Sequence, residues 1–298
     1  MKAIVLAGGY ATRLWPITKH RPKMFLPVGD STVIDTVFED LEADDRISEV
    51  YVSTNERFAD EFESYLATGG FEKPTLSVED TTDEDEKFGV VGALAQLIDR
   101  EGVDEDLIVI AGDNLISFDV AEFVDFFEAK GTPAIAAYDV GSKERARSYG
   151  LVELDGDRVV DFQEKPDDPR STLVSIACYA FPAETLPLFQ RYLAAGENPD
   201  EPGWFIQWMQ SRRPVHAFTF DGAWFDIGTP ESEIGENVHV MAGAEVIDST
   251  LERTVAFPNA AIRDADVRGS IIDEETRIEN LDLADALIGA HSTMTNGD

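Results

Sequence analysis

The feature that most constrains the fold is a regular alternation of two kinds of segment over the first 140 residues. Short apolar runs typical of β-strands occupy residues 2–7, 49–54, 74–78, 107–112 and 134–140. Between them lie segments with the apolar period of an amphipathic helix, at 31–43, 56–68, 90–101 and 119–130. Because strands connected through helices pair in parallel, this order predicts an α/β fold with a doubly wound, mostly parallel, Rossmann-like sheet. Ligands bind to such sheets beyond the carboxyl ends of the strands.

The pattern changes after residue 148, where consecutive strands replace the alternation. Strand-like segments at 148–154 and 158–165 flank Asp155-Gly156-Asp157, whose residues favour a tight hairpin turn. Further on, the sequence predicts a strand at 173–181, a helix at 183–195 and a strand at 214–220. Since hairpin strands pair antiparallel, we expect antiparallel additions to the parallel sheet.

From about Val238 onward, apolar residues recur at a spacing close to six, with small residues and aspartate between them. The recurring positions are Val240, Val246, Val267, Ile272 or Asp273, Ile278 and Ala284. This pattern resembles a short left-handed β-helix with hexapeptide repeats, and the alternative is a small β-rich cap without regular coils. We therefore expect a main domain over residues 1–237 and a hexapeptide-repeat, β-helix-like C-terminal segment over 238–298.

The charge is strongly acidic, with 59 Asp and Glu against 24 Lys and Arg and a net charge of −35. The acids are spread along the whole chain, and the hydrophobic content of 43% is that of a folded protein. A dense acidic surface fits surroundings in which salt screens self-repulsion, such as the cytoplasm of a halophile, and a haloarchaeal source is expected. It argues against nucleic-acid binding, because a phosphate backbone would be repelled.

The remaining bulk features predict a soluble, cytoplasmic protein. No apolar run is long enough to span a membrane, and the apolar start, Ala3 to Leu6, is too short for a signal peptide. The one cysteine, Cys178, excludes an intrachain disulfide and a cysteine-type zinc site. Because Cys178 lies in the apolar run 173–181, we expect a buried structural thiol and not a nucleophile.

Against this acidic background, the segment after the first strand is basic. No acid occurs from Met1 to Gly29, and four basic residues fall within eleven positions, namely Arg13, Lys19, Arg21 and Lys23. An ordinary surface loop would not be expected to lack acids in so acidic a chain. The segment is therefore predicted to hold anions, and phosphate is the anion that its chemistry suits.

The residue types in this segment suit phosphate binding. Gly8 and Gly9 allow a tight turn that brings backbone N–H groups near a ligand. Arg13 can donate two hydrogen bonds to phosphate oxygens, and Lys23 adds a mobile positive charge. The chain has no G-x-x-x-x-G-K-[ST] motif, so it is not a P-loop protein, and no G-x-G-x-x-G follows the first strand, so the dinucleotide fingerprint is absent.

The ordered string GGYATRLWPIT at residues 8–18, followed by Pro22-Lys23 and Leu26-Pro27, resembles the signature of the sugar nucleotidyltransferases. Five further strings similar to those of the family follow in family order, at residues 89–94, 112–114, 149–152, 164–166 and 224–230. Each alone has a structural alternative, such as a turn, an ion-paired strand end or a helix N-cap at Thr229. Together they extend the resemblance over about residues 1–237.

The resemblance implies an enzyme that joins a sugar 1-phosphate and a nucleoside triphosphate into a nucleoside-diphosphate sugar and pyrophosphate, for glycan precursor synthesis. The strings are most similar to the branch that uses glucose 1-phosphate with dTTP or UTP. A mannose-1-phosphate guanylyltransferase is the alternative within the family. A non-catalytic regulatory subunit and an NAD-dependent oxidoreductase are disfavoured, because the basic and acidic site residues are retained and the dinucleotide fingerprint is missing.

The resemblance also implies roles for individual residues. The catalytic set is Arg13, Lys23 and Lys165. The nucleotide-binding set is Leu6, Gly8, Gly9, Thr12, Arg13, Lys23, Gly89 and Asp113. The sugar-phosphate set is Gly150, Glu164, Lys165 and Ser175, and Asp113 and Asp226 would hold Mg²⁺. Homo-oligomerisation is left open. The acidic insertion at residues 80–86 and the pair Ala177-Cys178 depart from the family pattern, so the identity of the base and of the sugar stays undecided.

Overall fold

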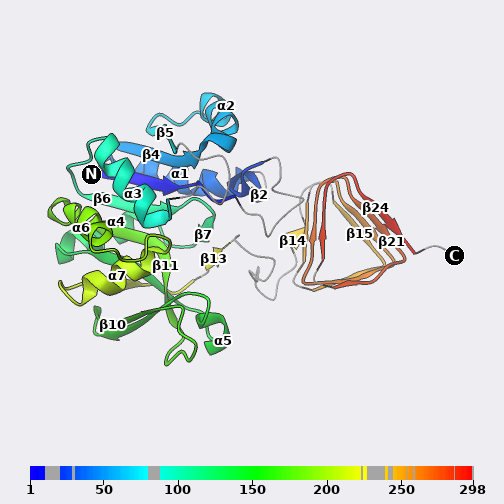
Figure 1. Ribbon diagram of the computed structural model, residues 1–298. Helices are drawn as coiled ribbons and strands as arrows, with labels where there is room; N and C mark the ends of the chain where they lie inside the picture. The colour runs from blue at the N-terminus through cyan, green and yellow to red at the C-terminus, as the bar shows by residue number, and fades with distance from the viewer. Residues whose placement is uncertain are drawn as a thin grey trace. The chain divides into compact units, whose positions relative to one another are not determined.

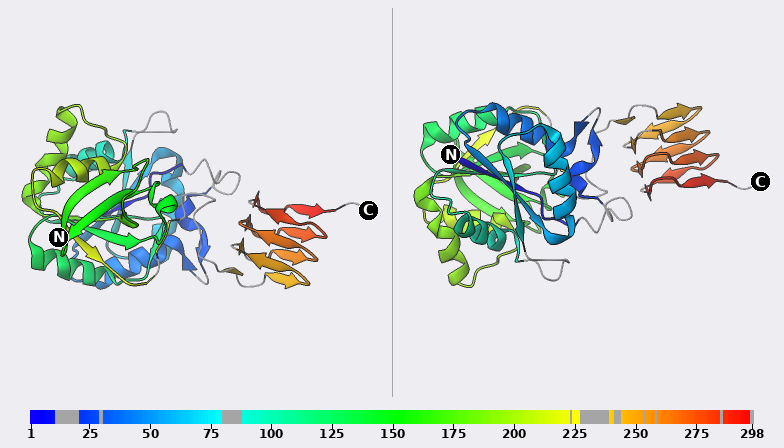
Figure 2. Two further views of the ribbon diagram at one scale, coloured as in Figure 1. Left: turned by 90° about the horizontal axis from the view of Figure 1, so that it is seen from below. Right: turned by 90° about the horizontal axis from the view of Figure 1, so that it is seen from above.

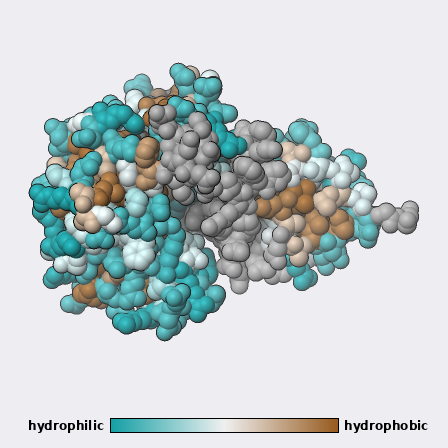
Figure 3. Space-filling model, in the orientation of Figure 1, coloured by the Kyte–Doolittle hydropathy of each residue, from teal (hydrophilic) through white to brown (hydrophobic). Residues whose placement is uncertain are grey.

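The computed structural model describes residues 1–10, 21–28, 31–79, 88–222, 224–226, 239–240, 244–252, 254–257, 259–284 and 286–296. Its internal contacts divide the chain into two compact units (Figure 1). The sheet unit contains residues 1–8, 38–112 and 116–224, and the coil unit contains residues 9–37, 113–115 and 225–298. Figure 3 shows hydrophilic residues over most of the described surface in view, as the composition predicts.

The described part of the sheet unit contains a nine-stranded mixed sheet in the order β5-β4-β1-β6-β11-β8-β12-β10-β9. Strands β5, β4, β1 and β6 pair in parallel, as do β8 and β12, whereas β9, β10 and β11 pair antiparallel with their neighbours. The predicted parallel sheet with antiparallel additions is therefore confirmed. The strands are β1 Lys2–Leu6, β4 Glu49–Asn55, β5 Pro74–Glu79, β6 Leu107–Ala111, β8 Ala134–Asp139, β9 Gly150–Asp155, β10 Arg158–Glu164, β11 Leu173–Phe181 and β12 His216–Thr219.

Helices cover both faces of this sheet (Figure 2). Ala217 of β12 belongs to the buried cluster that holds residues of α3, α6 and α7, whereas the next residue, Phe218, contacts Phe123 and Phe126 of α4. Since successive strand residues point to opposite faces, α4 lies on the face opposite to α3, α6 and α7. The helices are α1 Val33–Ala43, α2 Ala59–Gly69, α3 Val90–Arg100, α4 Val120–Lys130, α5 Lys143–Ala146, α6 Pro187–Ala194 and α7 Pro202–Gln210, with short 3₁₀ turns η2 Lys23–Phe25, η3 Glu56–Phe58 and η5 Ala183–Thr185.

The sequence missed two of these helices, α5 and α7. Helix α7 reads PGWFIQWMQ, and its apolar residues are too evenly distributed to give the helical period, although Pro202 is typical of a first helical position. Cys178 in β11 is 1% exposed, and burial raises the pKa of its thiol, so the expected buried thiol is confirmed. No helix among the described residues is long and apolar enough to cross a membrane.

The coil unit contains three ladders of short parallel strands, as a β-helix-like segment requires. The first ladder is β14 His239–Val240, β17 Val255–Ala256, β20 Ile271–Ile272 and β23 Leu287–Ile288. The second is β15 Glu245–Ile247, β18 Ala261–Arg263, β21 Arg277–Glu279 and β24 Thr293–Thr295. The third is β16 Thr250–Glu252, β19 Asp266–Arg268 and β22 Leu283–Ala284. The handedness and the boundary at 237/238 stay predictions.

The spacing in this segment differs from the hexapeptide repeat that the sequence predicted. Register partners lie sixteen residues apart, as in His239 with Val255 and Val255 with Ile271, whereas three hexapeptides would give eighteen. The buried residues at the centre are accordingly separated by five or six positions, at Ala256, Ile262, Val267, Ile272 and Ile278. The predicted spacing close to six therefore holds approximately, and the coil is shorter than three full hexapeptides because the steps from Ile262 to Val267 and from Val267 to Ile272 take five residues each.

The corners themselves carry residues in the left-handed region of the backbone. One corner repeats Asp248, Asp264 and Asn280, with φ of 48°, 48° and 53°. A second corner, which lies within the six-residue steps, repeats Asn259, Glu275 and His291, with φ of 61°, 53° and 59°. Asp and Asn tolerate this conformation better than other non-glycine residues, and they occupy four of these six positions.

Candidate functional site

The loop that follows β1 is tied to the carboxyl ends of neighbouring strands. The carbonyl oxygen of Leu6 accepts a hydrogen bond from the Gly112 N–H at 3.0 Å. The carbonyl oxygen of Gly8 accepts one from Asn55 Nδ2 at 2.9 Å. Leu6 and Gly8, both predicted to bind nucleotide, therefore lie at the edge of the sheet where ligands of such folds bind.

Glu79 lies beside this loop at the carboxyl end of β5. Its Oε1 accepts a hydrogen bond from Ser53 Oγ at 3.1 Å and would lie 3.7 Å from a Cβ on Gly8. Burial raises the pKa of the Glu79 carboxyl, against the opposing effect of the Ser53 hydrogen bond. Sequence reasoning did not assign Glu79 a role, and residues 80–87 that follow it lie outside the described residues.

In the coil unit, the predicted cation Lys23 contacts the predicted metal ligand Asp113. Lys23 begins η2, Asp113 follows β6, and the Lys23 ammonium forms an ion pair with the Asp113 carboxylate. Both side chains are 13% exposed, so the pair is largely shielded from water. Asn114 Nδ2 donates to Asp113 Oδ1 at 2.9 Å and helps to hold the carboxylate. A Cβ on Gly9 would lie 3.7 Å from Lys23 Cε, so Gly9 borders the same side chain.

The other predicted ligand of Mg²⁺, Asp226, ends the strand β13 Trp224–Asp226. This strand pairs with β7 Asn114–Ile116, so Asp226 lies on one strand of a two-stranded sheet and Asp113 directly precedes the other strand. Among the residues with described side chains, no group of three or more His, Cys, Asp or Glu could hold a metal ion. The Asp113 carboxylate already faces a cation, the Lys23 ammonium, and carboxylate oxygens suit Mg²⁺, which takes its other ligands from phosphate and water.

Thr12 and Arg13 lie outside the described residues, as does the side chain of Asp226. Their predicted roles therefore stay predictions. The remaining predicted residues, which are Gly89 and the sugar-phosphate set, all belong to the sheet unit.

The four residues of the predicted sugar-phosphate set lie next to one another on adjacent strands. Gly150 of β9 is the register partner of Glu164 in β10 and of Ser175 in β11. Lys165 follows Glu164 directly, and its N–H donates to the Tyr149 carbonyl at 3.1 Å. The structure thus brings together residues that are up to 25 positions apart in the sequence.

Glu164 is a buried carboxyl group, 9% exposed, at the end of β10. Burial, reinforced by the charge of Glu201 and opposed by Lys165, raises its pKa to about 7. Two glycines make room for it: a Cβ on Gly203 of α7 would lie 1.5 Å from Glu164 Oε2, and one on Gly150 would lie 2.9 Å from the same atom. Only glycine fits at Gly203 while Glu164 keeps this position.

This pKa predicts how stability depends on pH. Since the folded-state pKa of about 7 exceeds the ordinary value of 4.5, the folded protein holds this proton more tightly than the unfolded chain does. The contribution is fully present below pH 4.5 and is lost as pH rises through 7, by up to about 3 kcal/mol. Urea unfolding at pH 5 to 8 should show this slope in the wild type relative to Glu164→Gln; parallel pH profiles for the two proteins would contradict it.

Lys165 is held in a specific conformation beside Glu164. Its φ of 44° lies in the left-handed region, which is unfavourable for a lysine and marks a constrained position. Its ammonium forms an ion pair with Glu201, and both side chains are about half-exposed. Sequence reasoning missed Glu201 and Gly203, since it did not recognise α7; the only signal was the Glu201-Pro202 pair at the helix start.

Gly89, predicted to bind nucleotide, has a structural reason to be glycine. Its φ is 74°, and a Cβ there would lie 2.4 Å from the Pro199 carbonyl oxygen. The N–H groups of Val90 and Val91, the first residues of α3, donate to the carbonyls of Asp200 and Pro199 at 3.1 and 2.9 Å. The two N–H groups at the N-terminus of α3 therefore already donate hydrogen bonds to carbonyl oxygens of the chain itself.

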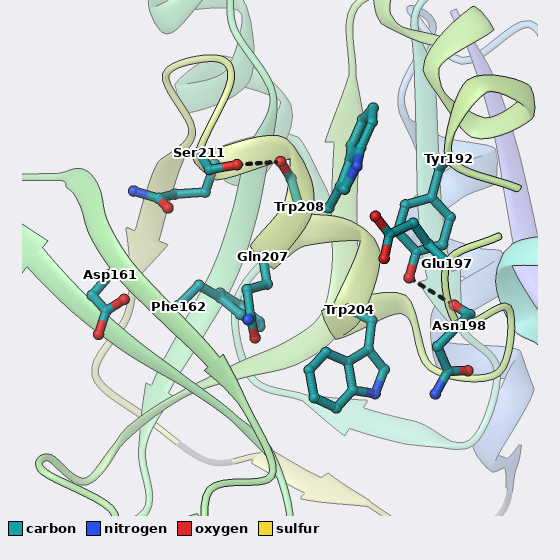
Figure 4. Close-up of a pocket in the computed structure, with 10 residues that line it drawn as sticks. Asp161, Phe162, Tyr192, Glu197, Asn198, Trp204, Gln207, Trp208 and Ser211 are labelled. Carbon is teal, nitrogen blue, oxygen red and sulfur yellow. Dashed lines mark hydrogen bonds between the residues drawn. The ribbon is translucent and has the colours of Figure 1, made fainter. Parts of the chain in front are cut away.

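A pocket of about 440 Å³ lies along the outer face of α7 (Figure 4). Trp204 and Gln207 of α7, Phe162 of β10 and Tyr192 of α6 contribute to its walls. Gln207 connects it to the sugar-phosphate set, because its Oε1 accepts a hydrogen bond from the Glu164 N–H at 3.2 Å. None of the residues predicted to carry the site lines this pocket.

A family model described as "Nucleotidyl transferase" matches residues 2–243. The chain is 29% identical over 239 residues to a UTP–glucose-1-phosphate uridylyltransferase of Synechocystis, covering 76% of this chain and 60% of that protein. It is 26% identical over 290 residues to the low-salt glycan biosynthesis nucleotidyltransferase Agl11 of Haloferax volcanii, covering 96% and 73%. The chain spans less than two thirds of the length of several of its relatives.

A solved structure of UDP-glucose pyrophosphorylase complexed with UDP-glucose has a similar fold. The TM-score is 0.63, with 22% sequence identity, over 78% of this chain and 94% of that chain. At this identity the likeness concerns the fold alone.

Proposed function

The chain belongs to the nucleotidyl transferase family, and on that premise we propose that it joins a nucleoside triphosphate and a sugar 1-phosphate into a nucleoside-diphosphate sugar and pyrophosphate. One observation supports this most: at the end of β10 the buried Glu164 carboxyl is followed directly in the chain by Lys165, whose positive charge acts on that carboxyl group. A carboxylate accepts hydrogen bonds from sugar hydroxyls, and an ammonium attracts a phosphate. The pair therefore suits the two ends of a sugar 1-phosphate.

The proposed reaction needs cations more than it needs a base. An oxygen of the sugar phosphate attacks the α-phosphorus in line, forming a new P–O bond while the bond to pyrophosphate breaks. The attacking phosphate is already an anion and a nucleophile, so no proton has to be removed. Catalysis then consists of positioning and of neutralising charge. Arg13 and Lys23 would stabilise the triphosphate and the leaving group, and Lys165 would align the sugar phosphate.

Two of these cations, Lys165 and Lys23, form ion pairs with carboxylates of the chain. Lys165 is paired with Glu201 and Lys23 with Asp113, so neither ammonium lacks a counter-charge before substrate arrives. An incoming phosphate would compete with Glu201 for Lys165, a half-exposed pair whose loss costs little. The Lys23 pair is more buried, which supports a fixed role for Lys23.

Asp113 and Asp226 are the residues proposed to hold Mg²⁺. Bound there, the ion would neutralise charge on the triphosphate and on the leaving pyrophosphate. Asn114 would orient Asp113 through the hydrogen bond at 2.9 Å.

For the substrates, we propose glucose 1-phosphate with dTTP or UTP, from the strings at residues 8–18 and 164–166. Glu79 favours a second candidate, a mannose-1-phosphate guanylyltransferase. Its half-buried carboxyl group lies beside Gly8 at the ligand edge of the sheet. A carboxylate only accepts hydrogen bonds, and guanine presents two adjacent N–H donors on one edge where uracil and thymine present one.

A panel of substrates tests the proposal. Pyrophosphate release would be measured for dTTP, UTP, GTP and ATP, each with glucose 1-phosphate and mannose 1-phosphate, in Mg²⁺ and at low and high salt. We expect release with one pair well above all others, dependent on both substrates and abolished by EDTA. If no pair releases pyrophosphate under any condition, the proposed function is wrong. The salt series also tests whether the acidic surface requires screening.

Glu79→Gln separates the two candidates for the base. If the base is guanine, we expect kcat/KM for GTP to fall by about tenfold or more. The glutamine side chain offers one acceptor and one donor, whereas the two N–H donors of guanine need two acceptors. For UTP or dTTP a change below about threefold is expected, since glutamine can still pair with a base that has one donor and two acceptors. The exposed variant Glu72→Gln is the matched control. If Glu79→Gln leaves kcat/KM unchanged from the wild type for every triphosphate, Glu79 does not favour guanine.

A further inference from the structure

The β-helix-like part of the coil unit packs against the segment that carries Lys23. Leu26 directly precedes β2 Pro27–Val28, and Val33 directly follows its antiparallel partner β3 Ser31–Thr32. Both share one buried cluster with Val255 and Phe257 of the β-helix-like segment, residues 239–296 (the coil). All four side chains are at most 5% exposed. Leu26 is three residues from Lys23, so the coil fixes the chain directly after the catalytic lysine.

An ion pair fixes the chain on the other side of Lys23. The Arg21 guanidinium donates to Asp273 Oδ1 at 2.9 Å and lies 5.8 Å from the centre of the Phe257 ring. The Asp273 side chain is only 5% exposed, and its Oδ1 also accepts from the Glu274 N–H at 2.8 Å, so the carboxylate has a fixed orientation. A buried carboxylate without its partner is costly, which ties Arg21 to this place on the coil.

The coil also contacts the chain segment that carries Asp113, the ion-pair partner of Lys23. Leu115, two residues after Asp113, packs against the same buried cluster, together with Ile271 and Leu287 of the coil. The two chain segments that bring Lys23 and Asp113 together are therefore both anchored on the coil, although the two residues are 90 positions apart in the sequence.

We propose that the coil is a positioning element for the reaction, acting through Asp273, Arg21 and Phe257 on the geometry of Lys23 and Asp113. This rests on the proposed function. Arg21, Asp273 and Phe257 are positioning residues, because they act through Lys23 and not on the substrate. The coil would thus act on the triphosphate end of the site, whereas the sugar-phosphate set belongs to the sheet unit.

A double-mutant cycle tests this inference by separating turnover from binding of the two substrates. Asp273→Asn and Arg21→Gln would be compared singly and together for kcat, for KM of each substrate and for thermal unfolding. We expect each single variant to lower kcat by about tenfold or more, since a displacement of about 1 Å can cost 100-fold. The double variant should be no worse than the poorer single one, and KM for the sugar phosphate should stay within about twofold.

The matched control is Glu245→Gln, which breaks the exposed Arg263–Glu245 pair on the same coil and should leave kcat unchanged. If Asp273→Asn fails to fold, Arg21→Lys keeps the charge but loses the forked geometry, and kcat should still fall about threefold or more. Normal kcat in the folded Asp273 or Arg21 variants, beside a wild type that releases pyrophosphate, overturns the inference and leaves the function intact. A wild type that never releases pyrophosphate overturns the function instead.

Discussion

Lys23→Ala is expected to lower kcat by about 100- to 1,000-fold, the usual cost of removing one charge-stabilising donor from a site of this kind. Two effects add. The positive charge near the leaving group is lost, and the Asp113 carboxylate, 13% exposed, is left without its cation in a region that must accept a triphosphate. Steady-state pyrophosphate release measures the loss, and circular dichroism melting shows whether the variant is folded.

The control for Lys23→Ala is Lys130→Ala. Lys130 pairs with the more exposed Asp157, and surface pairs of this kind contribute little, so activity and melting temperature should hardly change. Lys23→Arg should recover part of the turnover, because the charge is kept while its position shifts. Turnover of Lys23→Ala within about threefold of the wild type would show that Lys23 is not part of the machinery.

Gly203→Ala is expected to remove most of the affinity for sugar phosphate, with KM rising by about 100-fold or more. The new Cβ would lie 1.5 Å from Glu164 Oε2, so the carboxyl group has to leave its place between Gly150 and Gly203. A hydrogen-bonding site that loses its acceptor rejects its substrate by large factors. KM for the triphosphate, whose proposed contacts lie elsewhere, should change by less than about threefold.

Gly69→Ala is the matched control, a glycine in α2 where a Cβ would meet only side-chain atoms, with Phe71 at 3.2 Å and Tyr65 at 3.9 Å. Both variants replace a glycine in the first or last turn of a helix, so the gain in helix propensity in each stays below the value of about 1 kcal/mol for an interior position. Equal sugar-phosphate KM values in Gly203→Ala and the wild type would mean that Glu164 does not contact the sugar.

Much of the fold could be predicted from the sequence because its signals are local. The apolar runs of β1, β4, β5, β6 and β8 have the length of buried strands, and the helices between them have a clear period. Helix α7 was missed because it is buried on one side and lined with tryptophan and glutamine on the other, which leaves no clean period. The coil was recognised by its repeating apolar residues, and its sixteen-residue length was not, because the corners that shorten it depend on backbone conformation.

For the candidate site, the ordered motifs predicted roles for Lys23, Asp113, Glu164 and Lys165. In the structure Lys23 pairs with Asp113 and Lys165 pairs with Glu201, while Glu164 is buried next to Gly150 and Gly203. Glu201 and Gly203 escaped notice because nothing in a sequence reports which glycine faces which carboxyl group. Both lie at the start of a helix that the sequence did not reveal. Glu79 escaped notice for a similar reason, since its burial beside Gly8 arises from the pairing of β5 with β4 and β4 with β1.

The sequence by itself determined the family, the alternation of strands and helices over the first 140 residues, and the basic segment that stands out from a net charge of −35. These follow from the identity and spacing of nearby residues. Only the tertiary structure decided that Lys23 is paired with Asp113, that Glu164 is enclosed by two glycines, and that Arg21 is anchored on Asp273 across 252 positions. Such contacts depend on how distant segments pack, and burial then changes the chemistry of the groups they enclose, as the raised pKa of Glu164 illustrates.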